Sequence, residues 1–223
     1  MTETLSLRAK IEQSPMGAYQ WMIVVMAAIM NLLDGFDVLA LAFTATAIRG
    51  EFGLTGIELG YLLSAGLFGM TAGSLFLAPL ADKIGRRPLL LMAVSLSAIG
   101  MLGSAFISQY QWLGFWRVIT GLGVGGILVG TNVITSEYSS RKWRSFAISV
   151  YAAGFGVGAV LGGMFAVMLQ GEYGWRSVFL AGAILTGLLL VALFIWLPES
   201  IDFLTSKQPK NAEVRLNLIA FFI

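Results

Sequence analysis

The chain has 223 residues, of which 57% are hydrophobic and 12% charged, and its mean hydropathy is +0.83. Soluble domains carry about twice that share of charged residues, so the composition excludes an ordinary soluble domain and favours a membrane protein. The chain contains no cysteine and no histidine, which excludes disulfides, Cys/His metal sites and histidine-dependent catalytic triads. We therefore expect no metal, no cofactor and no enzymatic activity.

A polar start is followed by six apolar stretches. Residues 1–17 are polar and lack the apolar core of a signal peptide, and we expect them to form a cytoplasmic tail. About 20 residues suffice to cross the hydrocarbon core of a membrane, and the six predicted spans are residues 18–48, 57–81, 88–107, 112–138, 145–169 and 175–197. No run of short alternating strands appears. The sequence thus predicts an all-α membrane protein, with one six-helix bundle over residues 18–197 and a cytoplasmic linker, cut short, over residues 198–223.

The basic residues are distributed unevenly between the two ends of these spans. Of the 14 lysines and arginines, only Arg49 and Arg176 lie in loops on the opposite side of the membrane from residues 1–17. Arg117 lies within a span. Cytoplasmic loops of membrane proteins carry such an excess of Lys and Arg. We therefore predict a multi-pass protein of the inner membrane with both termini in the cytoplasm. The net charge of +2 is then a topology signal, and we expect no nucleic-acid partner.

Two carboxylates lie in the middle of the first predicted span. Asp34 and Asp37 are flanked by apolar residues on both sides, and Asn31 is the strongly polar residue before them. A charged residue at that depth costs about 3 kcal/mol, and residues three apart share a helix face. We expect that face to line a protein interior or a wet cavity. The alternative is a pair of acids at the end of a short helix, where they cap the helix or contact water.

Glycines recur four residues apart in the fourth and fifth spans. This small-xxx-small spacing lets membrane helices approach each other closely. The glycines that we expect at helix contacts are Gly121, Gly125, Gly158 and Gly162.

The segment between the second and third spans carries a recognisable charge pattern. Residues 73–87 read GSLFLAPLADKIGRR and resemble the signature loop of the major facilitator superfamily, G-x-x-x-D-[RK]-x-G-R-[RK], with Ala78 in place of the leading glycine. The resemblance implies that this loop helps set the balance between inward-open and outward-open states, through charge contacts with neighbouring cytoplasmic ends. The gating residues that we expect are Asp82, Lys83, Gly85, Arg86, Arg87, Arg141 and Arg144. Within this set we expect Asp82 to pair with an arginine: Arg86, Arg141 or Arg144.

Further segments narrow the resemblance. The run RVITGLG from Arg117 resembles the superfamily's R-x-x-x-G-x-G signature, and residues 197–204 resemble the segment that closes the first half of sugar porters and aromatic-acid symporters. The run DGFD from Asp34 to Asp37 resembles the D-G-x-D signature of the aromatic acid:proton symporter family. This resemblance implies that the two aspartates act in proton-coupled uptake of an aromatic or related carboxylate.

Carriers of this superfamily have twelve spans, and six are predicted here. We therefore expect an amino-terminal half, built from two inverted three-helix repeats, that needs a missing carboxy-terminal half and does not accumulate substrate alone. The partners implied are a small organic carboxylate, protons and the lipid bilayer. The alternatives are another solute porter of the superfamily, for a sugar or another organic anion, a half-size carrier that works as a dimer, and a six-span fragment that does not transport.

A third charge lies inside a predicted span. Arg117 is about 10 Å from the outer end of the fourth span, and Asp37 is about 16 Å from the outer end of the first. A long arginine side chain bridges that difference in depth. We hypothesise that Arg117 holds the substrate carboxylate, with two hydrogen bonds where geometry allows, while Asp34 and Asp37 take the proton. The alternative is a fixed ion pair that only offsets the cost of burial.

Overall fold

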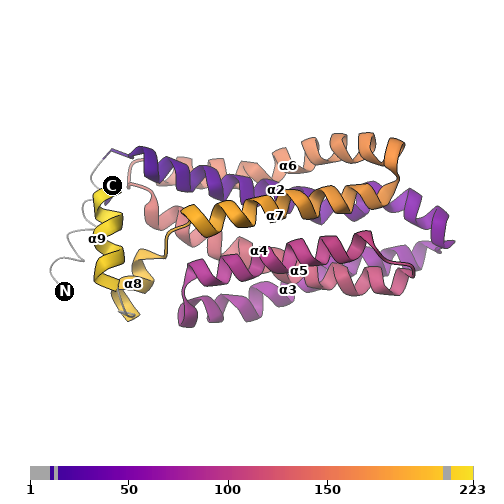
Figure 1. Ribbon diagram of the computed structural model, residues 1–223, viewed down its shortest axis with the longest axis horizontal. Helices are drawn as coiled ribbons and strands as arrows, with labels where there is room; N and C mark the ends of the chain where they lie inside the picture. Colours follow the sequence, from indigo (N-terminus) through magenta and orange to yellow (C-terminus); the bar gives the residue numbers. More distant parts are fainter. Residues whose placement is uncertain (1–10, 13–14, 208–211, 223) are drawn as a thin grey trace.

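The computed structural model describes residues 11–12, 15–207 and 212–222. Six long helices run side by side along the longest axis (Figure 1): α2 (Ala18–Phe52), α3 (Gly56–Ile84), α4 (Arg86–Ala105), α5 (Tyr110–Tyr138), α6 (Arg144–Tyr173) and α7 (Trp175–Trp196). Two short helices, α8 (Ile201–Lys207) and α9 (Ala212–Phe222), lie at the end of the bundle where α2 begins. The described part of the chain contains no strand.

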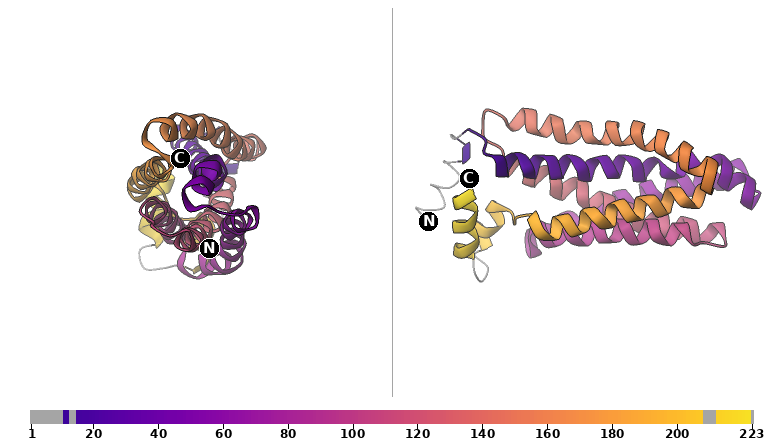
Figure 2. Two further views of the ribbon diagram at one scale, coloured as in Figure 1. Left: turned by 90° about the vertical axis from the view of Figure 1, so that its right-hand side faces the viewer. Right: turned by 45° about the horizontal axis from the view of Figure 1, so that its top comes forward.

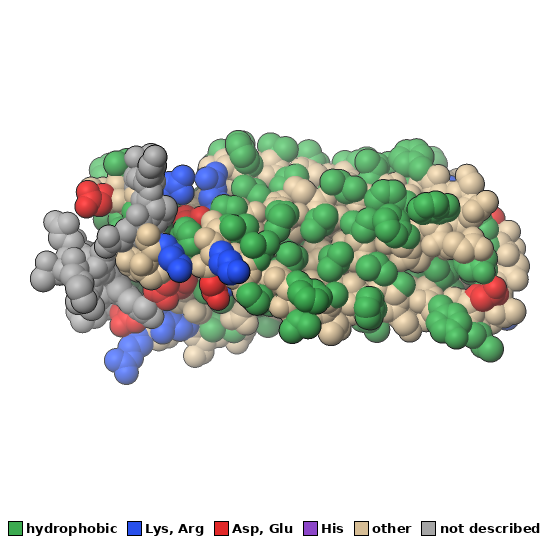
Figure 3. Space-filling model, turned by 90° about the horizontal axis from the view of Figure 1, so that it is seen from below, with side chains coloured by type: hydrophobic (Ala, Val, Ile, Leu, Met, Phe, Trp, Pro, Cys, Tyr) green, Lys and Arg blue, Asp and Glu red, His purple; other side chains and the backbone are tan. Residues whose placement is uncertain are grey.

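All six long helices are long and apolar enough to cross a membrane, which confirms the predicted all-α architecture with six spans. Figure 3 shows hydrophobic side chains along the middle of the bundle, while most of the charged side chains in that view gather at the end that carries α8 and α9. Phe68, Val160 and Phe194, on three different helices, are exposed. A soluble monomer rarely exposes apolar surface on this scale, so the surface fits a lipid environment.

The helix ends differ from the predicted ones by a few residues. The predicted charged loop over residues 82–87 shrinks to Gly85, because α3 continues to Ile84 and α4 begins at Arg86. Pro88 lies in the first turn of α4, where its missing N–H costs no hydrogen bond, so the helix starts before it. Gly85 has a φ of +102°, a conformation that glycine adopts at little cost. The predicted linker also differs, since it contains α8 and α9.

The two inverted repeats are α2 to α4 and α5 to α7. The helices α2 and α6 pack along each other, as the right-hand view of Figure 2 shows, and α3 packs along α5. The first helix of each repeat therefore contacts the second helix of the other repeat. The third helices, α4 and α7, also pack against each other. This exchange of partners is the arrangement that two repeats of opposite orientation produce.

Buried apolar side chains form two clusters. One cluster includes Met30 on α2 and Ile134 on α5, and the other includes Phe36 on α2 and Leu113 on α5. α2 and α5 are also the most buried of the six long helices and form the centre of the bundle. The charged residues predicted inside the membrane lie on these two helices.

Glycines bring α3 and α5 into backbone contact. A methyl group added to Gly121 would overlap the carbonyl oxygen of Gly66, and one added to Gly125 would overlap that of Met70. A side chain of any size at these two positions would push the helices apart.

The contact between α2 and α6 has the same character. A methyl group on Gly158 would overlap the carbonyl oxygen of Leu32, and one on Gly162 would lie 2.5 Å from a ring carbon of Phe36. These four glycines therefore lie where two pairs of helices approach most closely.

Gly158→Ala should lower the thermal stability of the protein, because the added methyl group overlaps the backbone of α2. Overpacking of this kind costs on the order of 1–3 kcal/mol. Gly156→Ala, on the same helix, is the matched control, since nothing lies within 4 Å of the added carbon. The midpoint of thermal unfolding in detergent checks the prediction, and equal midpoints for the two variants would show that α2 and α6 do not pack as described.

Candidate functional site

Three helices meet at the side chain of Asp37 on α2. Arg117 on α5 donates from Nη1 to Asp37 Oδ1 at 3.2 Å and from Nη2 to the Asp37 carbonyl oxygen at 2.7 Å. Ser97 on α4 donates from Oγ to Asp37 Oδ2 at 2.5 Å. Asp37 and Arg117 are only 2% and 3% exposed. The two charges are thus buried together, and a buried charge is tolerated where such a partner and hydrogen bonds are present.

Arg117 has contacts on further sides. Its Nη1 also lies 3.4 Å from Sδ of Met101 on α4, and its guanidinium carbon lies 5.7 Å from the centre of the Phe179 ring on α7. A cation at this distance is attracted by the ring. Four helices therefore determine where the guanidinium lies.

Asp34 lies one turn earlier on α2 in different surroundings. It is also 2% exposed, but its Oδ2 has no hydrogen-bond partner among the described residues. Asn31, a further turn earlier, donates from Nδ2 to the Tyr151 carbonyl oxygen on α6 at 2.8 Å, while its Oδ1 has no partner in the described part of the chain. The structure thus brings Arg117 together with Asp37 and not with Asp34, and it leaves two buried acceptor atoms without donors.

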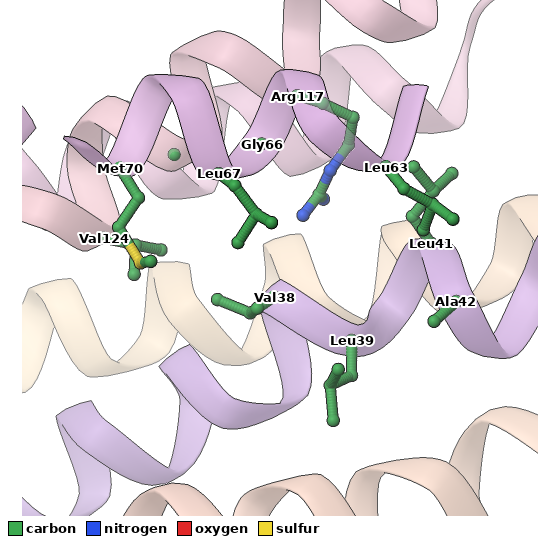
Figure 4. Close-up of a pocket in the computed structure, with 11 residues that line it drawn as sticks. Val38, Leu39, Leu41, Ala42, Leu63, Gly66, Leu67, Met70, Arg117 and Val124 are labelled. Carbon is green, nitrogen blue, oxygen red and sulfur yellow. The ribbon is translucent and has the colours of Figure 1, made fainter. Parts of the chain in front are cut away.

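A cavity of about 140 Å³ lies between α2, α3 and α5. Figure 4 shows the Arg117 side chain pointing from α5 into the space bordered by Leu63, Leu67 and Val38. Its lining residues are Val38, Leu39, Leu41, Ala42, Leu63, Gly66, Leu67, Met70, Arg117, Gly121 and Val124. Arg117 supplies the one charged side chain in that lining. The cavity can therefore hold an apolar body whose end carries a negative charge.

The predicted gating residues lie at the end of the bundle near α8. Asp82 pairs with Arg86 at 2.7 Å, one turn along the chain, which is one of the three partners that the sequence suggested. Arg144 instead lies 3.5 Å from Glu12, and the backbone N–H of Arg141 donates to the Glu12 carbonyl oxygen at 3.2 Å.

Gly85 and Arg87 belong to a second set of contacts at this end. The Glu199 carboxylate accepts a hydrogen bond from the Arg87 backbone N–H at 3.0 Å, and the Glu199 carbonyl oxygen accepts one from the Tyr138 hydroxyl at 2.7 Å. A methyl group on Gly85 would lie 2.6 Å from Glu199 Oε2. We call the four residues of this set the Glu199 clasp: Gly85, Arg87, Tyr138 and Glu199. The clasp joins the start of α4, the end of α5 and the segment after α7. Lys83, the remaining predicted gating residue, lies outside the clasp, and its side chain is exposed.

Sequence reasoning missed Ser97 and the role of Glu199. A serine in an apolar span gives no signal by itself, because serine is common in membrane helices. Glu199 offered a weak signal, since it follows directly on the last apolar span, but its contacts are with residues far away in the sequence.

Comparison with known proteins shows to which family the chain belongs. The sequence profile of the Major Facilitator Superfamily matches residues 27–220. The chain is 36% identical over 204 residues to the gallate transporter of Pseudomonas putida, covering 92% of this chain and 45% of that protein. It is 34% identical over 216 residues to the 4-hydroxybenzoate transporter PcaK of the same organism, covering 97% of this chain and 48% of the transporter. The chain spans about half the length of the curated relatives it matches.

Solved structures agree at the level of the fold. The partially occluded, inward-open xylose transporter XylE from E. coli superposes with a TM-score of 0.80 at 22% identity, over 91% of this chain and 55% of that one. A bacterial homologue of the human lysosomal transporter Spinster gives a TM-score of 0.74 at 21% identity, over 82% and 44% of the two chains. With six spans, two inverted repeats and a match to the family profile over most of its length, the chain belongs to the Major Facilitator Superfamily and has the fold of half of such a carrier.

Proposed function

We propose that this chain is the amino-terminal half of an inner-membrane carrier that takes up an aromatic or related organic carboxylate together with protons. The observation that supports this best is the Arg117 guanidinium in the wall of an otherwise apolar cavity. An aromatic carboxylate has the same division into one charged end and one apolar body. Gallate and 4-hydroxybenzoate, named for two of the relatives, are molecules of this kind.

The cavity suits the charged end of such a molecule in chemistry and its ring in size. A guanidinium has five N–H donors in one plane, and Asp37 uses only part of them. Leu63, Leu67 and Met70 supply apolar contacts for a ring. An apolar cavity of roughly 150 Å³ binds benzene, which is close to the volume of about 140 Å³ found here.

The pair of Asp37 and Arg117 can couple the substrate to a proton. With both groups charged, the buried pair is neutral as a whole. A substrate carboxylate at Arg117 would add a negative charge to a buried site, which is unfavourable, and a proton on Asp37 would remove the excess. We therefore propose that substrate and proton occupy this site together.

Asp34 is proposed as a second proton-coupling residue. Its Oδ2 and the Oδ1 of Asn31 are both buried acceptors without a donor in the described part of the chain. Buried polar atoms are rarely left in that condition. A proton on Asp34 would supply the donor that this region lacks.

The cytoplasmic ends are proposed to gate the carrier. The ion pair of Asp82 with Arg86 and the Glu199 clasp hold the ends of α3, α4 and α5 near one another. Lys83, Arg141 and Arg144 add positive charge at the same end of the bundle. In the whole carrier, the facing ends of the second half would contact this charged edge when the cytoplasmic side is closed.

The test is a chimeric carrier in which this chain replaces the matched first half of the P. putida gallate transporter. Cells that make the chimeric carrier should take up radiolabelled gallate, and a protonophore should abolish accumulation. The parental transporter, present at the same level in the membrane, is the control. The proposal would be refuted by a chimeric carrier that is present in the membrane at the parental level but takes up no aromatic acid. Accumulation that the protonophore does not change would also refute it.

The orientation can be tested with single thiols, because the chain has no cysteine. Gly56 and Lys142 are exposed at opposite ends of the bundle. A membrane-impermeant maleimide should label Gly56→Cys in intact spheroplasts, and it should label Lys142→Cys only after the membrane is permeabilised. The reverse pattern would place the termini outside the cell.

A further inference from the structure

Arg117 does not use its three nitrogen atoms equally. Nη1 donates to Asp37 Oδ1 and points at Sδ of Met101, and Nη2 donates to the Asp37 carbonyl oxygen. The structure gives Nε no hydrogen-bond partner within the described residues. The edge of the guanidinium formed by Nε and Nη2 is therefore the one that still has N–H groups to offer.

Gly66 on α3 faces that edge and lines the cavity (Figure 4). A methyl group on Gly66 would lie 3.9 Å from Arg117 Nε and 4.0 Å from Arg117 Nη2. The added carbon would thus be almost equally far from the two atoms that define the free edge. Its contact with the Arg117 backbone, 3.9 Å from the carbonyl oxygen, is an ordinary one.

Helix packing does not explain this glycine. A methyl group on Gly69 would overlap the Val118 carbonyl oxygen, and one on Gly73 would overlap that of Leu122. Those two glycines, one and two turns further along α3, are required for the approach of α5. At Gly66 a methyl group fits without overlap, so α3 and α5 could pack equally well with alanine there.

We infer that Gly66 is a specificity-determining residue, which keeps the Nε–Nη2 edge of Arg117 open so that the substrate carboxylate can bind it side-on; this inference rests on the proposed function. A carboxylate meets a guanidinium edge with two parallel hydrogen bonds, and the carboxylate carbon then lies in front of both nitrogen atoms. A side chain at residue 66 occupies the space from which the carboxylate approaches. The absence of a side chain at Gly66 therefore determines which anionic head groups reach Arg117.

The first test measures gallate uptake by the chimeric carrier with Gly66→Ala. The KM for gallate should rise at least about tenfold, as expected for the loss of one charge-assisted hydrogen bond, while the maximal rate and the midpoint of thermal unfolding stay close to those of the parent. Gly60→Ala is the matched control on α3, because nothing lies within 4 Å of its added carbon. If the parent takes up gallate and Gly66→Ala has the same KM, the inference is wrong and the proposed function stands.

A second readout uses the purified chain and does not depend on transport. Phenylglyoxal is an aromatic reagent that adds to guanidinium groups, and we expect it to reach Arg117 through the cavity. Mass spectrometry of peptides that contain this residue gives the rate of modification. Modification of Arg117 should be slower in Gly66→Ala than in the unaltered chain, and Gly60→Ala should match the latter. Equal rates in all three proteins would overturn the inference, whether or not the chimeric carrier takes up an aromatic acid. Failure of the chimeric carrier to take up an aromatic acid would count against the proposed function alone.

Discussion

Asp37→Asn in the chimeric carrier is expected to abolish gallate accumulation driven by a pH gradient. The amide keeps the size of the carboxyl group but only one of the two oxygens that accept hydrogen bonds from Ser97 and Arg117, and it does not take up and release a proton. The variant should also lose stability, because Arg117 is then a buried charge without its partner, and breaking such a pair costs about 3–5 kcal/mol. Uptake under an imposed pH gradient and the midpoint of thermal unfolding measure the two effects separately.

Asp34→Asn is the matched comparison for that experiment. Asp34 is three residues away on α2 and equally buried, but its replacement breaks no ion pair with Arg117. Accumulation should again be lost, while the unfolding midpoint stays near that of the parent. This variant should still exchange labelled for unlabelled gallate, since exchange moves no net proton. Normal accumulation by both aspartate variants would show that the two carboxylates are structural.

Arg117→Lys is expected to raise the KM for gallate by about 10- to 100-fold, although the positive charge is kept. Arg117 reaches both the side chain and the backbone oxygen of Asp37 from two nitrogen atoms. A lysine ammonium is a single point and lacks the planar, two-point contact that a carboxylate prefers. Lysine should therefore satisfy Asp37 or the substrate, but not both.

A neutral analogue provides the control for this variant. Inhibition of gallate uptake by 4-hydroxybenzoate should weaken strongly in Arg117→Lys, while inhibition by 4-hydroxybenzamide, which has no negative charge, should change little. Equal affinity for the acid in the variant and the parent would leave Arg117 with the role of a fixed ion pair only.

The sequence predicted the six spans because their signal is long and local. Each apolar stretch is long enough to cross the membrane core as a helix, so a polar loop on either side suffices to delimit it. The charged residues were also visible, since Asp34, Asp37 and Arg117 are conspicuous in apolar surroundings. Their depths even indicated that the arginine side chain could reach an aspartate.

The sequence did not predict which aspartate Arg117 contacts. Asp34 and Asp37 lie one turn apart, and the rotation of α2 about its axis decides which of them faces α5. That rotation depends on how α2 packs against its neighbours, for example on the backbone contact of Gly158 with Leu32, and this packing is a tertiary feature. The hydrogen bond from Ser97 to Asp37 joins residues 60 positions apart, and nothing in the local sequence marks it.

The Glu199 clasp also has a consequence for the order in which the protein is made. Glu199 accepts its hydrogen bond from the backbone of Arg87, 112 residues earlier in the chain. A ribosome adds about 5–20 residues per second, so the start of α4 exists for roughly 6 to 22 seconds before its partner is synthesised. During that time water must satisfy the free N–H groups of α4. The Glu199 clasp can therefore form only after the sixth span has left the ribosome, and a change at Glu199 would disturb this step of assembly while leaving the insertion of the earlier spans intact.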